Sequence, residues 1–484
     1  RLPIHFPNIY HLNTIRIMKT KHFLYSLLLA ASLPMNAQTV GKGGISPEML
    51  QQIKKAQPAA QTTTALRNAL AGAPINQLAT RANNPAVGDT YFSNTVPSKG
   101  ITDQQSSGRC WLFTGMNVMR SKMIKDYNLG AFQFSQSYSF FYDQLEKSNL
   151  FLQAVIDNAK KPMSDKLVEW LFQHPLSDGG TFCGVVDVVS KYGIVPADVM
   201  PESFSANNTA KMAELISLKL REYGLTLRKA AEKGEKAAAL EKRKTEMLGT
   251  IYHILAVSLG EPVQEFTWTM KDANGKPVST KKYTPQSFYK EYVGTDLKNT
   301  YVMLMNDPSR PYHKTYTIDM DRHSYDGQQW TYLNLPMEEI KQMAIASIKD
   351  STMMYYSCDV GKFLNGKTGI LSLQNYDYES LFGTNFPMTK AERISTFASA
   401  SSHAMTLMAV DLDANGKPTK WMVENSWGAT SGHNGHLIMT DEWFDEYSFR
   451  LVVDKKYVPA ATLELLKQKP TLLPAWDPLF AGEE

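Results

Sequence analysis

Residues 104–113 read QQSSGRCWLF, and in them a polar, glycine-bearing loop meets an apolar run at Cys110. The apolar side chains that follow recur at helical spacing, at Leu112, Met116, Met119 and Met123. Together with the start signal Ser106-Ser107-Gly108, this pattern predicts a helix that begins at Cys110. The N–H groups and the dipole at a helix N-terminus lower the pKa of a thiol, and the thiolate is its nucleophilic form. Cys110 is therefore a candidate nucleophile, with a merely well-placed cysteine as the alternative.

A base for this nucleophile is expected at His403, which opens the apolar run 404–410. That run predicts a buried strand, and a polar ring at its end needs a partner. Residues 421–428 read WMVENSWG and predict a return strand that brings Asn425 alongside. An amide oxygen can hold an imidazole in its productive tautomer. Taken alone, His403 would be read as a core histidine with its hydrogen bonds satisfied.

The His403–Asn425 pair makes a demand on the hairpin between them. If the two residues lie directly opposite, the loop centre is (403 + 425)/2 = 414, which requires an odd-length loop centred on Ala414. A two-residue turn at Asn415-Gly416 would place the two residues on opposite faces. We therefore expect a longer loop or a β-bulge in this hairpin.

Stabilisation of an oxyanion is expected from Gln104, six residues before Cys110. Its side-chain amide can donate together with the backbone N–H of Cys110. Gln105 is the adjacent competitor, and local reasoning does not choose between the two glutamines.

The composition is that of a globular protein, with 43% hydrophobic and 20% charged residues in 484. Three cysteines are too few for a disulfide scaffold, and Cys183 and Cys358 are expected to be buried. The sequence DANGKP occurs at 272–277 and at 413–418 and is interpreted as the same hairpin chemistry used twice. The second copy begins like a calcium loop, but Met422 stands where the bidentate glutamate is needed, so no metal is predicted.

The N-terminal residues 1–37 are expected to be upstream sequence and a signal peptide. Met18, the expected initiator, is followed by lysines, an apolar stretch over 23–33 and a small-residue site near Ala37. The stretch is too short to span a bilayer, so we expect export to the periplasm or secretion, without a stable membrane anchor. This segment holds four basic residues and no acids, so the net charge of +4 becomes 4 − 4 = 0 on cleavage. No nucleic-acid footprint is indicated.

The rest of the chain is expected to divide into two parts. Residues 38–87 are rich in Gln, Ala, Thr and Asn and are interpreted as a flexible linker or pro-like segment, with ordered chain from near Tyr91. Residues 88–484 are interpreted as one enzyme domain, in which 207–248 predict solvated helices dense in Lys and Glu.

Three segments, 104–113, 402–405 and 423–428, resemble the active-site segments of papain-like cysteine peptidases. More narrowly, the chain resembles the bleomycin hydrolase/aminopeptidase C family over roughly residues 88–484. Further segments carry this likeness: 134–138, 178–180, 191–193, 200–203, 358–362, 439–444 and 474–478.

The resemblance implies an α+β papain-like fold, with a helical subdomain, a β-barrel-like subdomain and a helical insertion. It also implies roles for the candidate residues: Cys110 as nucleophile, His403 as base, Asn425 as its orienting partner and Gln104 as oxyanion donor. Trp427 would shield the His–Asn pair from water. Gly179 and Gly180 would present their backbone to a peptide substrate. No cofactor and no metal are implied.

The separation between the candidate cysteine and histidine bears on the narrower family. Simple papain-like enzymes place the histidine about 130–150 residues after the cysteine, whereas here the separation is 403 − 110 = 293. The excess places an insertion at about 203–340 and resembles the larger members, which form homohexamers with interior active sites.

The C-terminal tail, residues 474–484, would reach the active site, where the carboxylate of Glu484 would pair with the substrate α-ammonium. Its ending, LFAGEE, departs from the usual Met-Gly-Ala of the family.

The function implied is that of a thiol-dependent aminopeptidase that hydrolyses peptides through an acyl-enzyme. A papain-like endopeptidase is the alternative within the same class. A catalytically silent, oligomeric binding protein is the alternative outside it, and it is disfavoured because all four catalytic candidates are present.

Overall fold

The computed structural model describes residues 43–57, 60–84, 86 and 89–479. The chain divides into two compact units, residues 1–68 and 69–484. In the first unit, α1 (Pro47–Lys55) begins after Ser46, whose side chain accepts a hydrogen bond from the backbone N–H of Met49. Helix α2 (Ala60–Gly72) runs from the first unit into the second. The signal peptide expected over residues 1–37 lies outside the described residues.

The helical part of the second unit is built around the helix that Cys110 begins. This helix, α4 (Cys110–Tyr127), is buried over most of its first three turns and packs against α5, α7 and strand β10. An apolar cluster from these helices forms one core of the unit. The neighbouring helices are α5 (Gln136–Asp157), α6 (Lys166–Gln173) and α7 (Phe182–Tyr192).

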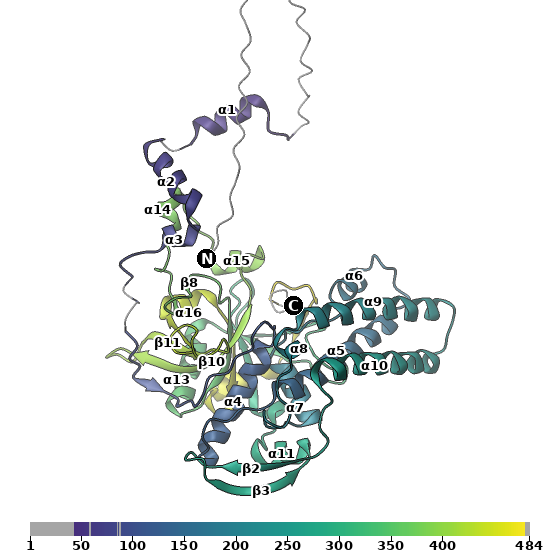
Figure 1. The fold of residues 1–484 in the computed structure, drawn as a ribbon. Helices are drawn as coiled ribbons and strands as arrows, with labels where there is room; N and C mark the ends of the chain where they lie inside the picture. The colour runs from purple at the N-terminus through teal and green to yellow at the C-terminus, as the bar shows by residue number, and fades with distance from the viewer. Residues whose placement is uncertain (1–42, 58–59, 85, 87–88, 480–484) are drawn as a thin grey trace, which may run out of the picture. The chain divides into compact units, whose positions relative to one another are not determined.

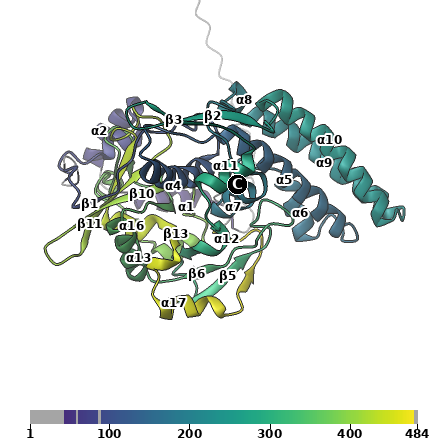
Figure 2. The ribbon, with the colours of Figure 1, turned by 90° about the horizontal axis from the view of Figure 1, so that it is seen from below.

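Two long helices, α9 (Ala210–Glu232) and α10 (Ala237–Leu259), lie side by side against α5 (Figures 1 and 2). Most of their charged residues are exposed, although Arg228 and Lys244 are buried, and one apolar stripe of each helix is buried. The predicted hairpin around 272–275 is confirmed as β2 (Phe266–Lys271) and β3 (Pro277–Tyr283). The short helices of this region are α8 (Phe204–Asn207), α11 (Pro285–Tyr292) and α12 (Leu297–Thr300).

The other part of the second unit is a large mixed sheet, which in the described chain has the order β14-β5-β6-β4-β13-β7-β10-β11-β12-β9-β8, with β1 also paired to β10. Its strands are β1 (Asn94–Thr95), β4 (Tyr301–Met305), β5 (Lys314–Ile318), β6 (Tyr332–Asn334), β7 (Met354–Cys358), β8 (Leu364–Asn365), β9 (Ile370–Leu371), β10 (His403–Leu412), β11 (Pro418–Glu424), β12 (His436–Thr440), β13 (Ser448–Asp454) and β14 (Thr471–Leu473). The remaining helices are α3 (Ile75–Ala79), α13 (Met337–Lys349), α14 (Tyr378–Phe382), α15 (Lys390–Ser395), α16 (Asp441–Tyr447) and α17 (Ala460–Glu464), with 3-10 turns η1 (Lys455–Tyr457) and η2 (Leu465–Lys467).

This architecture confirms the expected α+β fold. The range expected for the insertion, 203–340, holds helices α8–α12, the β2–β3 hairpin and three further strands. Strands β4, β5 and β6 fall within that range and belong to the main sheet, where β4 pairs with β13. Helices α8–α12 and the hairpin precede Tyr301, and the three strands that follow join the main sheet. Sequence separation alone did not reveal this, because strands buried on both faces carry no alternating pattern.

The segment interpreted as a flexible linker, 38–87, also differs from expectation. Its described residues form helices α1, α2 and α3, and residues 79–81 are hydrogen-bonded to other segments of the second unit. Asp377 donates from its backbone N–H to the carbonyl of Ala79 at 2.7 Å, and Arg81 donates to the carbonyl of Asn375 at 3.1 Å. Ala79 is buried. Ordered chain thus begins well before Tyr91. Among the helices of the described residues, none has the length and apolar content needed to cross a membrane.

Candidate active site

Cys110 is the first residue of α4, as the sequence predicts, and Arg109 is the residue before the helix. The next side chain, Trp111, is fully buried and donates from Nε1 to the carbonyl of Asp178 at 2.9 Å. This contact ties the helix start to the loop before α7. The two other cysteines, Cys183 and Cys358, are buried as expected.

His403 and Asn425 are joined by a hydrogen bond. Nε2 of His403 lies 2.8 Å from Oδ1 of Asn425, and both side chains are buried. Because an amide oxygen only accepts, Nε2 carries the proton, and Nδ1 is the nitrogen left to exchange a proton with a thiol. Trp427 stacks on the His403 ring with centroids 4.7 Å apart, at the position expected for a shield over the pair.

The strands that carry this pair contain the expected bulge. The register of β10 and β11 shifts between Leu407 and Ala409, which leaves Met408 as an extra residue, and shifts again near the hairpin end. The loop spans five residues, because Leu412 pairs with Pro418. His403 and Asn425 do not lie directly opposite each other, which was the arrangement assumed for a loop centred on Ala414. The pair Thr406↔Glu424, continued by one residue, places Asn425 opposite Met405, so it meets His403 on the diagonal of the same face.

The two glutamines left open by the sequence occupy different environments. Gln104 is buried and lines one pocket with Cys110 and His403. Its Oε1 accepts from Ser426 Oγ at 2.7 Å, and its Nε2 donates to the carbonyl of Ser107 at 2.6 Å. Gln105 is exposed, has a positive φ of 52°, and donates to Asp103 instead. Geometry therefore favours Gln104.

Burial opposes charge on both members of the candidate catalytic pair. It raises the pKa of the Cys110 thiol to about 11, against the lowering effect of backbone hydrogen bonds, of which that with Ala404 is the largest. Burial thus acts against the lowering of the thiol pKa that is expected from the helix N-terminus. Burial also lowers the pKa of His403 to about 4. Burial therefore favours the uncharged thiol and the uncharged imidazole, and transfer of the thiol proton creates both charges together.

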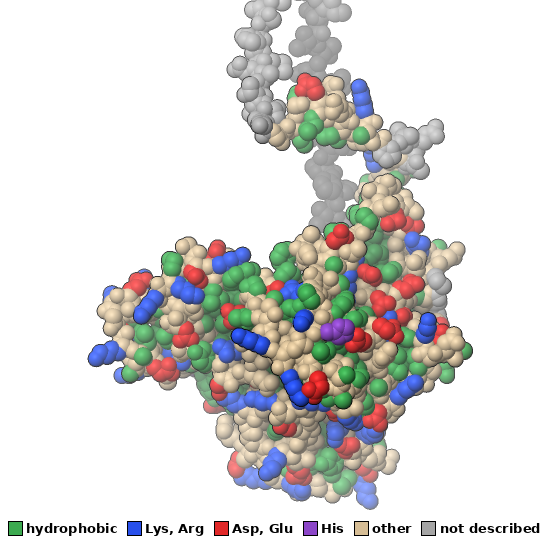
Figure 3. All heavy atoms as spheres, turned by 180° about the vertical axis from the view of Figure 1, so that it is seen from behind, with side chains coloured by type: hydrophobic (Ala, Val, Ile, Leu, Met, Phe, Trp, Pro, Cys, Tyr) green, Lys and Arg blue, Asp and Glu red, His purple; other side chains and the backbone are tan. Residues whose placement is uncertain are grey.

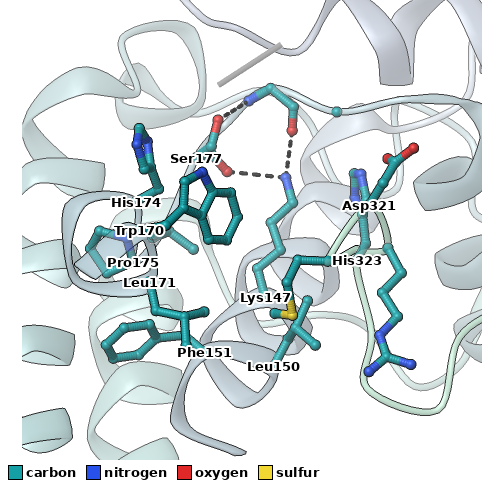
Figure 4. Close-up of a pocket in the computed structure, with 15 residues that line it drawn as sticks. Lys147, Leu150, Phe151, Trp170, Leu171, His174, Pro175, Ser177, Asp321 and His323 are labelled. Carbon is teal, nitrogen blue, oxygen red and sulfur yellow. Dashed lines mark hydrogen bonds between the residues drawn. The ribbon is translucent and has the colours of Figure 1, made fainter. Parts of the chain in front are cut away.

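The glycine pair forms one wall of the pocket that Cys110 lines. Lys147 donates from Nζ to the carbonyl of Gly179 at 2.5 Å and to that of Ser177 at 3.0 Å (Figure 4). A Cβ at Gly180 would lie 2.2 Å from the ring of His323, so no side chain fits there. The glycine pair therefore presents its backbone to the cleft, and its far side borders an apolar pocket lined by Leu150, Phe151, Trp170 and Leu171 (Figure 4).

Lys147 and His323 share a buried carboxylate that the sequence analysis missed. Asp143 lies 3.0 Å from Lys147 Nζ and 2.5 Å from His323 Nδ1. Asp178 and Ser426 were given no role of their own, although each lies within a segment that carries the family likeness. Membership of such a segment was the only signal, since their contacts come from distant segments.

The tail expected at the active site is described up to Leu479. Its backbone carbonyl accepts from Arg450 Nη2 at 2.8 Å, and Asp477 lies 3.1 Å from Arg310 Nη2. Trp476 lies under the ammonium of Lys166, at the start of α6. Glu484, expected to meet the substrate, lies outside the described residues. Within the described residues, no group of three or more acidic, histidine or cysteine side chains is arranged to hold a metal ion.

A helix-borne cysteine that shares a pocket with a strand-borne histidine and its asparagine, within an α+β fold, defines the protein as a papain-like cysteine peptidase. Comparison with known proteins agrees with this class. The chain belongs to the Peptidase C1-like family, which matches residues 44–480.

Individual relatives cover most of the chain. Bleomycin hydrolase of Mus musculus is 41% identical over 404 residues, which are 81% of this chain and 89% of that protein. Aminopeptidase C of Lactobacillus delbrueckii subsp. lactis is 38% identical over 398 residues, 81% and 88% of the two chains. The crystal structure of PepW from Lactobacillus rhamnosis matches with a TM-score of 0.87 and 36% identity, and covers 90% of this chain and 99% of that chain.

Proposed function

We propose that the protein is a thiol-dependent aminopeptidase that removes N-terminal residues from peptides. The observation that carries the proposal is the pocket in which Cys110, His403 and Gln104 converge, with Asn425 bonded to His403. Relatives named aminopeptidase C and bleomycin hydrolase, at about two-fifths identity, support the same activity.

In the proposed mechanism, the sulfur of Cys110 attacks the carbonyl carbon of the first peptide bond while its proton passes to Nδ1 of His403. The oxyanion accepts hydrogen bonds from the Cys110 backbone N–H and from Nε2 of Gln104. His403 then gives the proton to the departing amine, and a water deprotonated by His403 hydrolyses the thioester. Asn425 holds the ring orientation throughout, and the closeness of the nascent charges offsets the desolvation that each would suffer alone.

Restriction to the N-terminus is proposed to come from the tail. The described part of the tail supports this, because Leu479 is bound by Arg450, which lies opposite Ser357 on the next strand, and Ser357 lines the pocket of Cys110. The residues beyond Leu479 would then lie within reach of the cleft, where Glu484 would meet the substrate α-ammonium.

The test is hydrolysis of matched fluorogenic amino-acid amides, free and N-acetylated, under reducing conditions, with Cys110→Ala as control. The proposal expects cleavage of the free amines only, lost in the control. Equal cleavage of both substrates would identify an endopeptidase. No cleavage of either would favour the catalytically silent binding protein.

Assembly into a homo-oligomer, a hexamer by the family likeness, is part of the proposal. It is supported by the apolar side chains that α9 exposes, Leu215, Leu218 and Leu225, on the arm where Figure 3 shows hydrophobic and charged side chains interspersed. Light scattering of the purified protein tests it, and a monomeric mass would contradict it.

Export is proposed from the sequence of residues 18–37. Fractionation of cells that produce the full chain, with N-terminal sequencing of the product, tests this step. A mature protein that begins near Gln38 outside the cytoplasm is expected, and uncleaved protein in the cytoplasm would contradict it.

A further inference from the structure

The base of the helical insertion contacts the loop that carries the nucleophile. Ser106 donates from its backbone N–H to the carbonyl of Asn207 at 3.0 Å. Nη2 of Arg109, the residue before Cys110, lies 2.7 Å from Oε2 of Glu202. We call residues 202–209 the insertion base. They contact the nucleophile loop directly at these two points.

A third link runs through Asp178. Its Oδ2 accepts from the backbone N–H of Gly108 at 2.7 Å and from the hydroxyl of Thr209. A Cβ at position 108 would lie 2.3 Å from Oδ1 of the same carboxylate, so the loop approaches Asp178 as closely as only glycine allows. Asp178 lines the pocket of Cys110. The position of Gly108, two residues before the nucleophile, is therefore set by a carboxylate that Thr209 holds.

Thr209 is placed for this contact and not for its own helix. It precedes α9, where a threonine side chain ordinarily caps the first turn, but its hydroxyl makes no cap hydrogen bond. The side chain is instead almost fully buried, at 1% exposure, and is turned to Asp178. Thr209 thus makes a long-range hydrogen bond to Asp178 in place of a cap hydrogen bond at the start of α9.

The Arg109 link is equally specific. The guanidinium is fully buried and lies over the rings of Phe113 and Phe140 at 5.2 and 5.3 Å. A buried cation needs its counter-ion, which Glu202 supplies. Oε1 of Glu202 also accepts from the backbone N–H of Ser137 at 3.0 Å, at the start of α5. Glu202 thereby links the loop to the start of α5.

The geometry points to Thr209 and Glu202 as positioning residues for the proposed peptidase reaction. They act through Asp178 and Arg109 to hold the loop so that the Cys110 N–H and Gln104 aim at one oxyanion position. This inference rests on the proposed function. Donors displaced by as little as 1 Å lose transition-state stabilisation, while binding of the ground state changes little.

The first experiment compares Thr209→Val, which removes the hydroxyl at constant shape, with Thr209→Ser, which keeps it. Thr226→Val is the matched control, because Thr226 is exposed on the same helix. For Thr209→Val we expect kcat on a free aminoacyl amide to fall about tenfold with KM within about twofold. Thr209→Ser and Thr226→Val are expected to match the parent within about twofold.

A second readout separates positioning from general damage. A peptide aldehyde forms a hemithioacetal whose oxygen occupies the oxyanion position, whereas alkylation of Cys110 by iodoacetamide forms no oxyanion. For Thr209→Val, the aldehyde dissociation constant should rise in proportion to the loss of kcat, and the alkylation rate and thermal midpoint should stay near those of the parent. Loss of all four readouts together would overturn the inference in favour of a structural role.

Glu202→Gln provides an independent variant, with Glu222→Gln on the exposed side of α9 as its control. The inference is overturned if Thr209→Val and Glu202→Gln both keep kcat and the aldehyde dissociation constant within about twofold of the parent. A parent protein that hydrolyses no aminoacyl amide would contradict the proposed function instead. Aldehyde binding and alkylation would then still decide the role of Thr209, because neither needs turnover.

Discussion

His403 and Asn425 meet across a diagonal of the sheet, with Nε2 and Oδ1 2.8 Å apart, and not across a direct cross-strand pair. A bulge at Met408 makes this possible. Residues 409–411 of β10 pair with 420–422 in one register, and residues 406–407 pair with 423–424 in a register shifted by one. Without that shift Asn425 would point to the opposite face.

The bulge lies where β10 changes its neighbour. Strand β7 pairs with residues 403–407, and β1 takes over at Ala409 and Val410. The carbonyl of Met408 accepts from the backbone N–H of Val96 at 2.9 Å. The carbonyl of the extra residue therefore finds its hydrogen-bond donor in the segment that follows β1. The site geometry therefore depends on a segment more than 300 residues before it in the chain.

Replacement of Gln104 should affect catalysis more than replacement of Gln105. Gln104→Ala removes a donor from the pocket of Cys110, so kcat is expected to fall about 100-fold with little change in KM. Gln105→Ala, at an exposed position, serves as the matched control and should stay within about twofold. Steady-state kinetics on a free aminoacyl amide decide this, and equal losses would remove Gln104 from the proposed mechanism.

Replacement of Asn425 should shift the acid limb of the pH profile of kcat/KM. Burial lowers the pKa of His403 to about 4, and the hydrogen bond that the ring donates to Asn425 Oδ1 opposes this by favouring the protonated ring. Asn425→Ala should therefore move the acid limb of kcat/KM to lower pH and reduce kcat by about tenfold, because the base is weaker and less well oriented. The measurement is a pH profile from 3 to 9 with Asn415→Ala, in the hairpin loop, as control. A shift of the acid limb to higher pH would contradict the role assigned to Asn425.

Two helical glycines should respond oppositely to alanine. At Gly115 a Cβ would lie 2.6 Å from Val185, so Gly115→Ala is expected to reduce the free energy of unfolding by about 1–3 kcal/mol. At Gly249 on α10 nothing lies within 4 Å, and Gly249→Ala should increase it by about 0.5–1 kcal/mol. Urea unfolding followed by circular dichroism measures both. A stabilised Gly115→Ala would show that α4 and α7 are less closely packed than described.

The anchoring of the tail should control the preference for free N-termini. Asp477→Asn removes the charge that pairs with Arg310, while its Oδ1 can still accept from the N–H of Leu479. The rate on N-acetylated relative to free substrate is expected to rise about tenfold, since a hydrogen-bonded ion pair contributes on the order of 1.5–3 kcal/mol. Glu464→Gln, an exposed acid-to-amide change, is the control. An unchanged ratio would separate the tail anchor from substrate selection.

Much of the site could be predicted because its signals are local. The helix that starts at Cys110, the buried strand that starts at His403 and the need for a bulge before Asn425 all follow from consecutive residues and their periodicity. The family likeness rests on the same local segments, and the fold it implied is confirmed.

Only the tertiary structure gave the different environments of Gln104 and Gln105, showed the burial that opposes charge on Cys110, and assigned β4–β6 to the main sheet. It also brought Thr209 and Glu202 to the nucleophile loop. Backbone conformation and periodicity are encoded over a few residues, whereas burial and its electrostatic consequences depend on which distant segments pack together. The desolvation of Cys110 depends on several segments that pack around it, so it cannot be predicted from any single stretch of the sequence.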